Sequence, residues 1–147
     1  MARTVEFHTG VTDLAQFACR LLRKAFQRGA TVLCVAPRGT LEALDRALWT
    51  FAEREFVPHI RLETAPGRLR ARTPVWLAES VPPEGPARDV VLNLGVPLAL
   101  AAVGEARLIE LVAEAPEDVA AGRERWRQYK AAGFEVIHHP PGTSREG

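Results

Sequence analysis

Hydrophobic residues along the chain form short strand-like runs separated by helical stripes. Residues 4–8 alternate between polar and apolar side chains, and residues 31–36 and 89–94 are short, largely apolar runs; both patterns are typical of strands. Between the first two runs, apolar residues recur at three- and four-residue spacing from Leu14 to Phe26, which predicts a helix with one face toward a core. Strands that alternate with helices through short connections predict a three-layer α/β domain around a mostly parallel sheet.

The second half of the pattern adds two helices and a final strand. Residues 41–52 carry a further apolar stripe after Thr40, a residue type that caps helices. Pro116, followed by two acidic residues, is typical of a helix start, and Gly133 of a helix end. Residues 134–139 then predict the last strand.

Few segments interrupt this alternation. Residues 61–74 are polar and irregular, with arginine at every second position from Arg68 to Arg72, and we expect a solvated connection there. Neither an internal repeat nor a boundary divides the chain. Residues 1–139 are therefore predicted to form a single domain, and residues 140–147 a flexible C-terminal tail.

Composition narrows the function classes. The chain has 147 residues with 19 basic and 18 acidic side chains, so its net charge of +1 gives no overall field toward DNA or membrane. Its apolar runs fall short of the ~20 residues that span a bilayer, and its start has no signal-peptide core. Cys19 and Cys34 lie among apolar neighbours, which indicates buried thiols in a reduced, cytoplasmic setting.

The sequence gives little indication of a catalytic site. The turns that contain Gly10 and Gly39 have neither the dinucleotide glycine spacing nor a Gly-Lys-Ser/Thr phosphate loop. The histidines are not placed at a helical spacing that would hold zinc, and His138 and His139 point to opposite faces of their strand. We therefore expect no catalytic residues, no cofactor and no metal. A nucleotide-binding-like enzyme remains the alternative.

The final predicted helix carries a basic face with an indole in its middle. Arg123, Trp126, Arg127 and Lys130 follow the i, i+3, i+4, i+7 spacing that brings side chains together. Single-stranded nucleic acid could stack on Trp126, or an acidic peptide could pair its carboxylates with the basic side chains. A solvated helix with Trp126 turned inward is the third possibility. The nearly neutral net charge favours a small anion site over direct nucleic-acid binding.

A second stretch places large aromatic residues at the edge of an element. Leu44 and Leu48 form a core stripe, with Trp49 beside it and Phe56 just after the helix. Such rings either cover the core or form the centre of a protein interface. The pattern leaves both interpretations open.

These two stretches carry a resemblance to a known family. "LDRALWTFAEREFVPH" (residues 44–59) and "RERWRQYKAAGFEV" (residues 123–136) resemble segments of the chi subunit of bacterial DNA polymerase III holoenzyme, an accessory component of the clamp-loader complex. The order of elements and the chain length extend the likeness to the whole sequence. The family's aromatic residue at the Trp126 position is commonly tyrosine, so the pocket here differs in depth and lacks a hydroxyl.

The resemblance implies a non-catalytic adaptor with a Rossmann-like fold and no functional nucleotide-binding loop. It implies that Arg123, Trp126 and Arg127 bind the acidic C-terminal tail of single-stranded DNA-binding protein, which ends in Pro-Phe; Lys130 joins them on helical geometry alone. Trp49 and Phe56 match positions that face psi, the subunit that tethers chi to the clamp loader, and another protein could take that surface. DNA would be contacted only indirectly.

Overall fold

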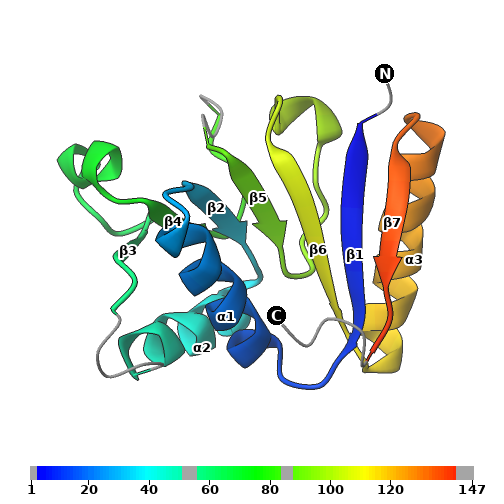
Figure 1. Cartoon of the computed structure of the whole chain (residues 1–147), viewed down its shortest axis with the longest axis horizontal. Coiled ribbons are helices and arrows are strands. Elements are labelled where there is room, and N and C mark those ends of the chain that lie inside the picture. The colour runs from blue at the N-terminus through cyan, green and yellow to red at the C-terminus, as the bar shows by residue number, and fades with distance from the viewer. Residues whose placement is uncertain (1–2, 51–55, 84–87, 142–147) are drawn as a thin grey trace.

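The computed structural model describes residues 3–50, 56–83 and 88–141, and its centre is a seven-stranded sheet (Figure 1). Every pairing between neighbouring strands is parallel, in the order β3-β4-β2-β5-β6-β1-β7. The strands are β1 (Thr4–Val11), β2 (Val32–Val35), β3 (His59–Arg61), β4 (Val75–Ala78), β5 (Val90–Asn93), β6 (Arg107–Ala113) and β7 (Glu135–His139).

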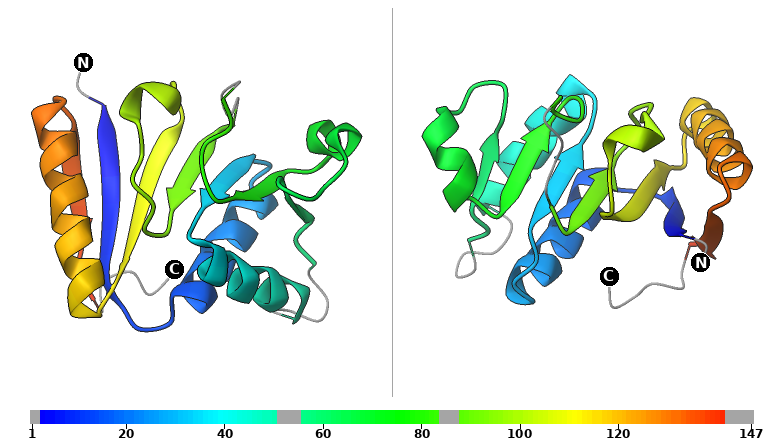
Figure 2. Two further views of the ribbon diagram at one scale, coloured as in Figure 1. Left: turned by 180° about the vertical axis from the view of Figure 1, so that it is seen from behind. Right: turned by 90° about the horizontal axis from the view of Figure 1, so that it is seen from above.

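Helices cover both faces of this sheet (Figure 2). The helices α1 (Leu14–Gln27) and α2 (Arg38–Thr50) pack on one face, and α3 (Pro116–Ala131) packs on the other. Alternate strand residues supply the two cores, so that Val32 and Cys34 face α1 and α2 whereas Leu33 and Val35 face away. The predicted three-layer, Rossmann-like α/β fold with a parallel sheet is confirmed.

Local signals account for the helix boundaries. The Asp13 side chain accepts a hydrogen bond from the Gln16 backbone N–H at 3.0 Å and so caps α1. Pro116 occupies the first turn of α3, where its missing N–H costs nothing. Gly133 follows α3 with φ of 91°, a conformation that a residue with a side chain rarely adopts. The predictions at Pro116 and Gly133 are confirmed.

Two segments of the structure differ from the prediction. The helix α2 begins at Arg38 rather than after Thr40, because Pro37 supplies the first carbonyl, which accepts from the Leu41 N–H at 2.9 Å. Its predicted end falls in residues 51–55, outside the described residues. The strand β3 was not predicted, since its three residues follow a proline and carry only one strongly β-forming side chain, Ile60.

The arginine-rich connection is more ordered than predicted. Gly67–Arg72 forms a short 3₁₀ helix, η1, and the Arg70 carbonyl accepts hydrogen bonds from the Trp76 indole at 3.1 Å and from Arg88 at 3.2 Å. The Arg88 guanidinium also stacks on the Trp76 ring, 3.5 Å from its centroid. Arg68 and Arg72 are exposed, so the expectation of a solvated connection is right for their side chains and wrong for the backbone.

The remaining elements fit between these layers. Leu100–Ala102 forms a second 3₁₀ helix, η2, between β5 and β6. Cys19 and Cys34 are buried free thiols, as predicted. The expected tail at residues 140–147 lies outside the described residues beyond Pro141. Within the described part of the chain, no helix is both long and apolar enough to cross a bilayer.

Candidate functional site

A pocket of about 400 Å³ lies where α3 crosses β1, β6 and β7. Three of the four residues predicted on the basic face line it, namely Arg123, Trp126 and Arg127; Lys130 is exposed on the same helix but is not part of the lining. We call this feature the Trp126 pocket. Its lining consists of Phe7, Thr9, Val112, Val119, Gly122, Arg123, Trp126, Arg127 and His138.

Trp126 is half-buried, with its ring held by two other aromatic side chains. The Phe7 ring lies 5.0 Å away at an angle of 53°, and the His138 ring meets the indole edge-on at 5.4 Å. His138 in turn shares a hydrogen bond of 2.7 Å with the Thr9 hydroxyl. The indole therefore forms a fixed apolar wall of the pocket and is not sealed inside the core.

The guanidinium groups beside this wall face solvent. Arg123 and Arg127 are both exposed. Arg127 contacts Glu124 at 3.2 Å, but both side chains are more than half exposed, at 71% and 62%. A surface pair of this kind contributes well under about 1 kcal/mol, so an incoming carboxylate can replace Glu124. The pocket thus joins an apolar wall to a positively charged rim.

A buried polar network fixes α3 against the sheet beneath the pocket. Glu110 on β6 is fully buried; its Oε1 accepts a hydrogen bond from Arg125 Nε at 2.8 Å, and its Oε2 accepts from the Tyr129 hydroxyl at 2.8 Å and from Asn93 at 3.0 Å. Burial raises the pKa of Glu110, and Arg125 and the other donors oppose that shift. Burial and the nearby Glu110 raise the pKa of Tyr129, which keeps its hydroxyl a donor.

The helix α3 packs closely on β6, which allows its side chains to reach Glu110 in this network. A side chain at Gly122 would place its Cβ 3.0 Å from both methyl groups of Val112, closer than such atoms normally approach. Glycine at this position therefore lets α3 lie directly on β6.

The second predicted surface lies at the C-terminal end of α2, near the edge of the sheet opposite β7 (Figure 1). Trp49 is 65% exposed and Phe56 is 45% exposed, and their rings are 5.0 Å apart. Both contact the His59 ring, which shares hydrogen bonds with the Val57 carbonyl at 2.7 Å and with Asp45 at 2.9 Å. We call Trp49 and Phe56 the aromatic surface. The structure keeps it separate from the Trp126 pocket.

Sequence reasoning missed the contributions of the strands to these sites. Phe7, Thr9 and His138 line the Trp126 pocket because β1 and β7 are neighbours in the sheet, a pairing of the first and last strands that linear spacing does not reveal. The same pairing brings Glu6, His8 and His139 together on the other face. The alternation of residues 134–139 was the one available signal, because it placed His138 and His139 on opposite faces.

Comparison with known proteins gives a consistent result. The sequence model of the family described as "DNA polymerase III chi subunit, HolC" matches residues 1–137. The DNA polymerase III subunit chi of Pseudomonas aeruginosa is 34% identical over 125 residues, which cover 84% of each chain. The DNA polymerase III subunit chi of Escherichia coli strain K12 is 27% identical over 129 residues, 86% of this chain and 85% of that protein. The chain belongs to the family of DNA polymerase III chi subunits, which gives it an accessory role in DNA replication.

Proposed function

We propose that the chain is a non-catalytic adaptor of the replicase whose Trp126 pocket binds the acidic C-terminal tail of single-stranded DNA-binding protein. The observation that carries this proposal is the combination of a half-buried indole with exposed guanidinium groups at Arg123 and Arg127 around one pocket. A peptide that ends in Pro-Phe after several aspartates matches both features. Its ring is apolar, and its terminal carboxylate and aspartates are anionic.

Each part of the tail has a counterpart in the pocket. The terminal phenylalanine ring would pack on Trp126 and Phe7, a burial that contributes about 1.5–3 kcal/mol. The terminal carboxylate would accept hydrogen bonds from the guanidinium of Arg123 or Arg127, and hydrogen bonds to charged groups contribute about 1.5–3 kcal/mol each. Lys130, exposed one turn beyond Trp126, would attract the upstream aspartates without contacting the ring.

The expected affinity is moderate. Ordering a flexible tail and its arginine partners offsets part of the gain from burial and hydrogen bonds. A dissociation constant in the micromolar range, which corresponds to about −8 kcal/mol, is therefore expected. Binding should weaken as salt rises, because the rim charges are exposed and screened.

The aromatic surface would bind the second partner. Exposed tryptophan and phenylalanine side chains in contact are the kind of cluster that supplies most of the binding energy in protein interfaces. We propose that Trp49 and Phe56 contact psi, or another protein that takes its place, and so link the chain to the clamp loader. The two sites lie at opposite ends of the sheet, which would let both partners bind together.

A pull-down tests the first half of this proposal. The full chain should retain intact single-stranded DNA-binding protein and lose it when the last residues of that protein are removed. Equal retention of both forms would refute tail binding. Direct nucleic-acid binding is the competing hypothesis, and it predicts that the chain alone binds a single-stranded oligonucleotide tightly, without the binding protein.

A further inference from the structure

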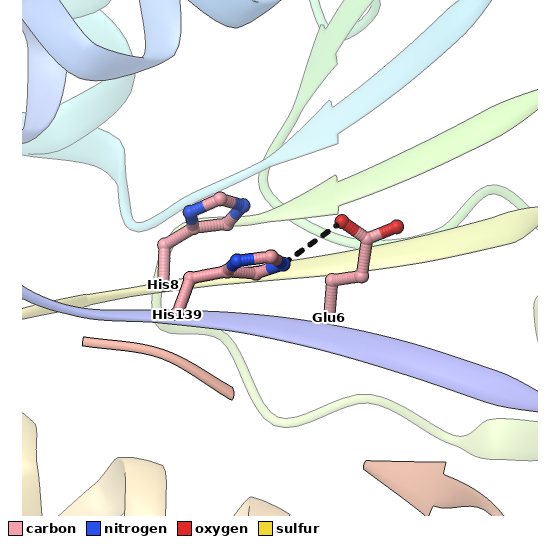
Figure 3. A group of neighbouring side chains, drawn as sticks. All are labelled: Glu6, His8 and His139. Carbon is pink, nitrogen blue, oxygen red and sulfur yellow. Dashed lines mark ion pairs between the residues drawn. The ribbon is translucent and has the colours of Figure 1, made fainter. Parts of the chain in front are cut away.

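Glu6, His8 and His139 lie together on the face of the sheet opposite α3 (Figure 3). His8 on β1 and His139 on β7 are paired in register, and Glu6 precedes His8 by two residues, which places its side chain on the same face. One potential ligand atom from each residue lies within 4.8 Å of the others. Two adjacent strands therefore present three side chains of the types that bind transition metals.

The contacts within this group give one ring nitrogen of His139 an ion-pair contact but no hydrogen bond. The His8 and His139 rings stack with centroids 4.5 Å apart and an angle of 14° between their planes. His139 Nε2 is 3.4 Å from Glu6 Oε1, and it is a buried atom that makes no hydrogen bond to any described residue. A buried ring nitrogen that is ion-paired with a carboxylate oxygen but makes no hydrogen bond leaves both atoms available to a bound ion.

Arg107 holds the carboxylate in place for such a role. Its guanidinium donates hydrogen bonds from Nη2 at 2.6 Å and from Nε at 3.1 Å, both to Glu6 Oε2. The other oxygen, Oε1, is directed toward His139, as the dashed contact in Figure 3 shows. Carboxylates that bind metals are commonly oriented by a hydrogen bond to their second oxygen, which is the arrangement seen here.

The pocket beside the cluster has room for an ion, and the ligand types favour one class of ion. A pocket of about 320 Å³ has Glu6, His8 and His139 in its wall, with Lys24 and Arg28 of α1 also in the lining. With a single carboxylate, the cluster does not suit magnesium or calcium, which require several oxygen ligands. Imidazole nitrogens instead favour zinc, copper or nickel, and two histidines with one carboxylate form a common zinc ligand set with an open fourth position.

We propose that Glu6, His8 and His139 bind one zinc ion at the wall of this pocket. In a tetrahedral zinc site, bonds of about 2.0–2.1 Å place the ligand atoms ~3.3 Å from one another. The three side chains must therefore rotate so that their ligand atoms come closer together. His139 is the side chain with room to turn, since it is 33% exposed whereas His8 is buried. The bound ion would cross-link the last strand, β7, to β1.

Titration of the full chain tests this site. Protein stripped with a chelator is titrated with zinc by calorimetry and with cobalt(II) by visible absorption, which reports four-coordinate geometry. We expect saturation at one ion per chain. His139→Asn should weaken binding at least tenfold, because one ligand is lost, whereas the matched variant His138→Asn, on the other face of the same strand, should bind as the wild type does.

Two results would overturn the proposal. One is the absence of any calorimetric or spectral change when zinc or cobalt is in tenfold excess over the wild-type chain. The other is equal affinity of the wild type and His139→Asn. Circular dichroism checks that each variant is folded. If His139→Asn is not, Glu6→Gln replaces it, with the same expected loss, because this substitution keeps the size of the side chain while removing its charge.

Discussion

Arg125 and Glu110 form an ion pair that is enclosed between α3 and β6, with Nε and Oε1 2.8 Å apart. The Arg125 side chain is 7% exposed and that of Glu110 is fully buried. Arg123 and Arg127, two residues before and after, are exposed at the Trp126 pocket. The basic motif therefore divides into two functions: its central arginine attaches the helix to the sheet, and the flanking arginines remain available for a ligand.

Arg125→Met should destabilise the fold strongly. The substitution leaves the Glu110 carboxylate buried without its charged partner, a loss that costs about 3–5 kcal/mol in comparable sites. Urea denaturation followed by circular dichroism measures the free energy of unfolding.

The double variant Glu110→Leu with Arg125→Met is the matched control. It removes both charges and should recover much of the lost stability, because well-packed apolar groups can replace a buried ion pair. A stability of Arg125→Met within about 0.5 kcal/mol of the wild type would contradict the structural role assigned to Arg125.

The fold could be predicted from the sequence where hydrophobic periodicity was strong. The stripe from Leu14 to Phe26, the proline at 116 and the glycine at 133 were sufficient for α1 and α3, because each signal acts within a few residues. The strand β3 escaped prediction because three residues are too few to show a period. The order of strands in the sheet is a long-range property, and no local pattern carries it.

The two sites, like the fold, could be predicted from the sequence only where the signal lay within one element. Helical spacing alone brought Arg123, Trp126 and Arg127 to one pocket, whereas the pattern could not decide how far Trp126 turned inward. The wall formed by Phe7 and His138 depends on the pairing of β1 with β7 and was not predicted. Resemblance to the chi family added the proposed ligand, because the chemistry of the residues had left the choice open between a peptide and nucleic acid.

Cys19 should resist alkylation in the folded protein. Burial, followed by the nearby Asp13, raises the pKa of the Cys19 thiol to about 11, and burial raises that of Cys34 as well. At pH 8 only about one Cys19 side chain in a thousand is then the reactive thiolate. Mass spectrometry after iodoacetamide treatment should find both cysteines unmodified in buffer and modified in denaturant.

The same shift predicts a loss of stability at high pH. Between about pH 9 and pH 11 the folded state retains thiol protons that the unfolded state has released, so the free energy of unfolding should fall as pH rises. Rapid modification of native Cys19 at pH 8 would contradict the burial described here.

Trp49→Ala and Phe56→Ala should preserve the fold and abolish binding of the second partner. Both rings are largely exposed, so each substitution should cost no more than about 1.5 kcal/mol, roughly the contribution of an aromatic pair. Thermal denaturation measures the first effect, and co-purification with psi or with the clamp loader measures the second.

Trp76→Ala is the matched control for these two variants. The Trp76 ring is half-buried under the Arg88 guanidinium and its indole N–H bonds to the Arg70 carbonyl, so its loss should lower stability by about 3 kcal/mol or more. If Trp49→Ala and Phe56→Ala unfold the chain as readily as Trp76→Ala does, their rings belong to the core and the aromatic surface is not an interface.

Titration of a fluorescently labelled acidic peptide that ends in Pro-Phe tests the central claim most directly. The wild type should bind it with micromolar affinity, and Arg123→Ala and Arg127→Glu should each weaken binding at least tenfold, because each removes a charge-assisted hydrogen-bond donor from the pocket rim. Arg46→Glu changes an exposed arginine on α2 and has the same charge change as Arg127→Glu; it serves as the control and should bind as the wild type does. Unchanged peptide affinity in both pocket variants would contradict the proposal that the Trp126 pocket is the binding site for the tail.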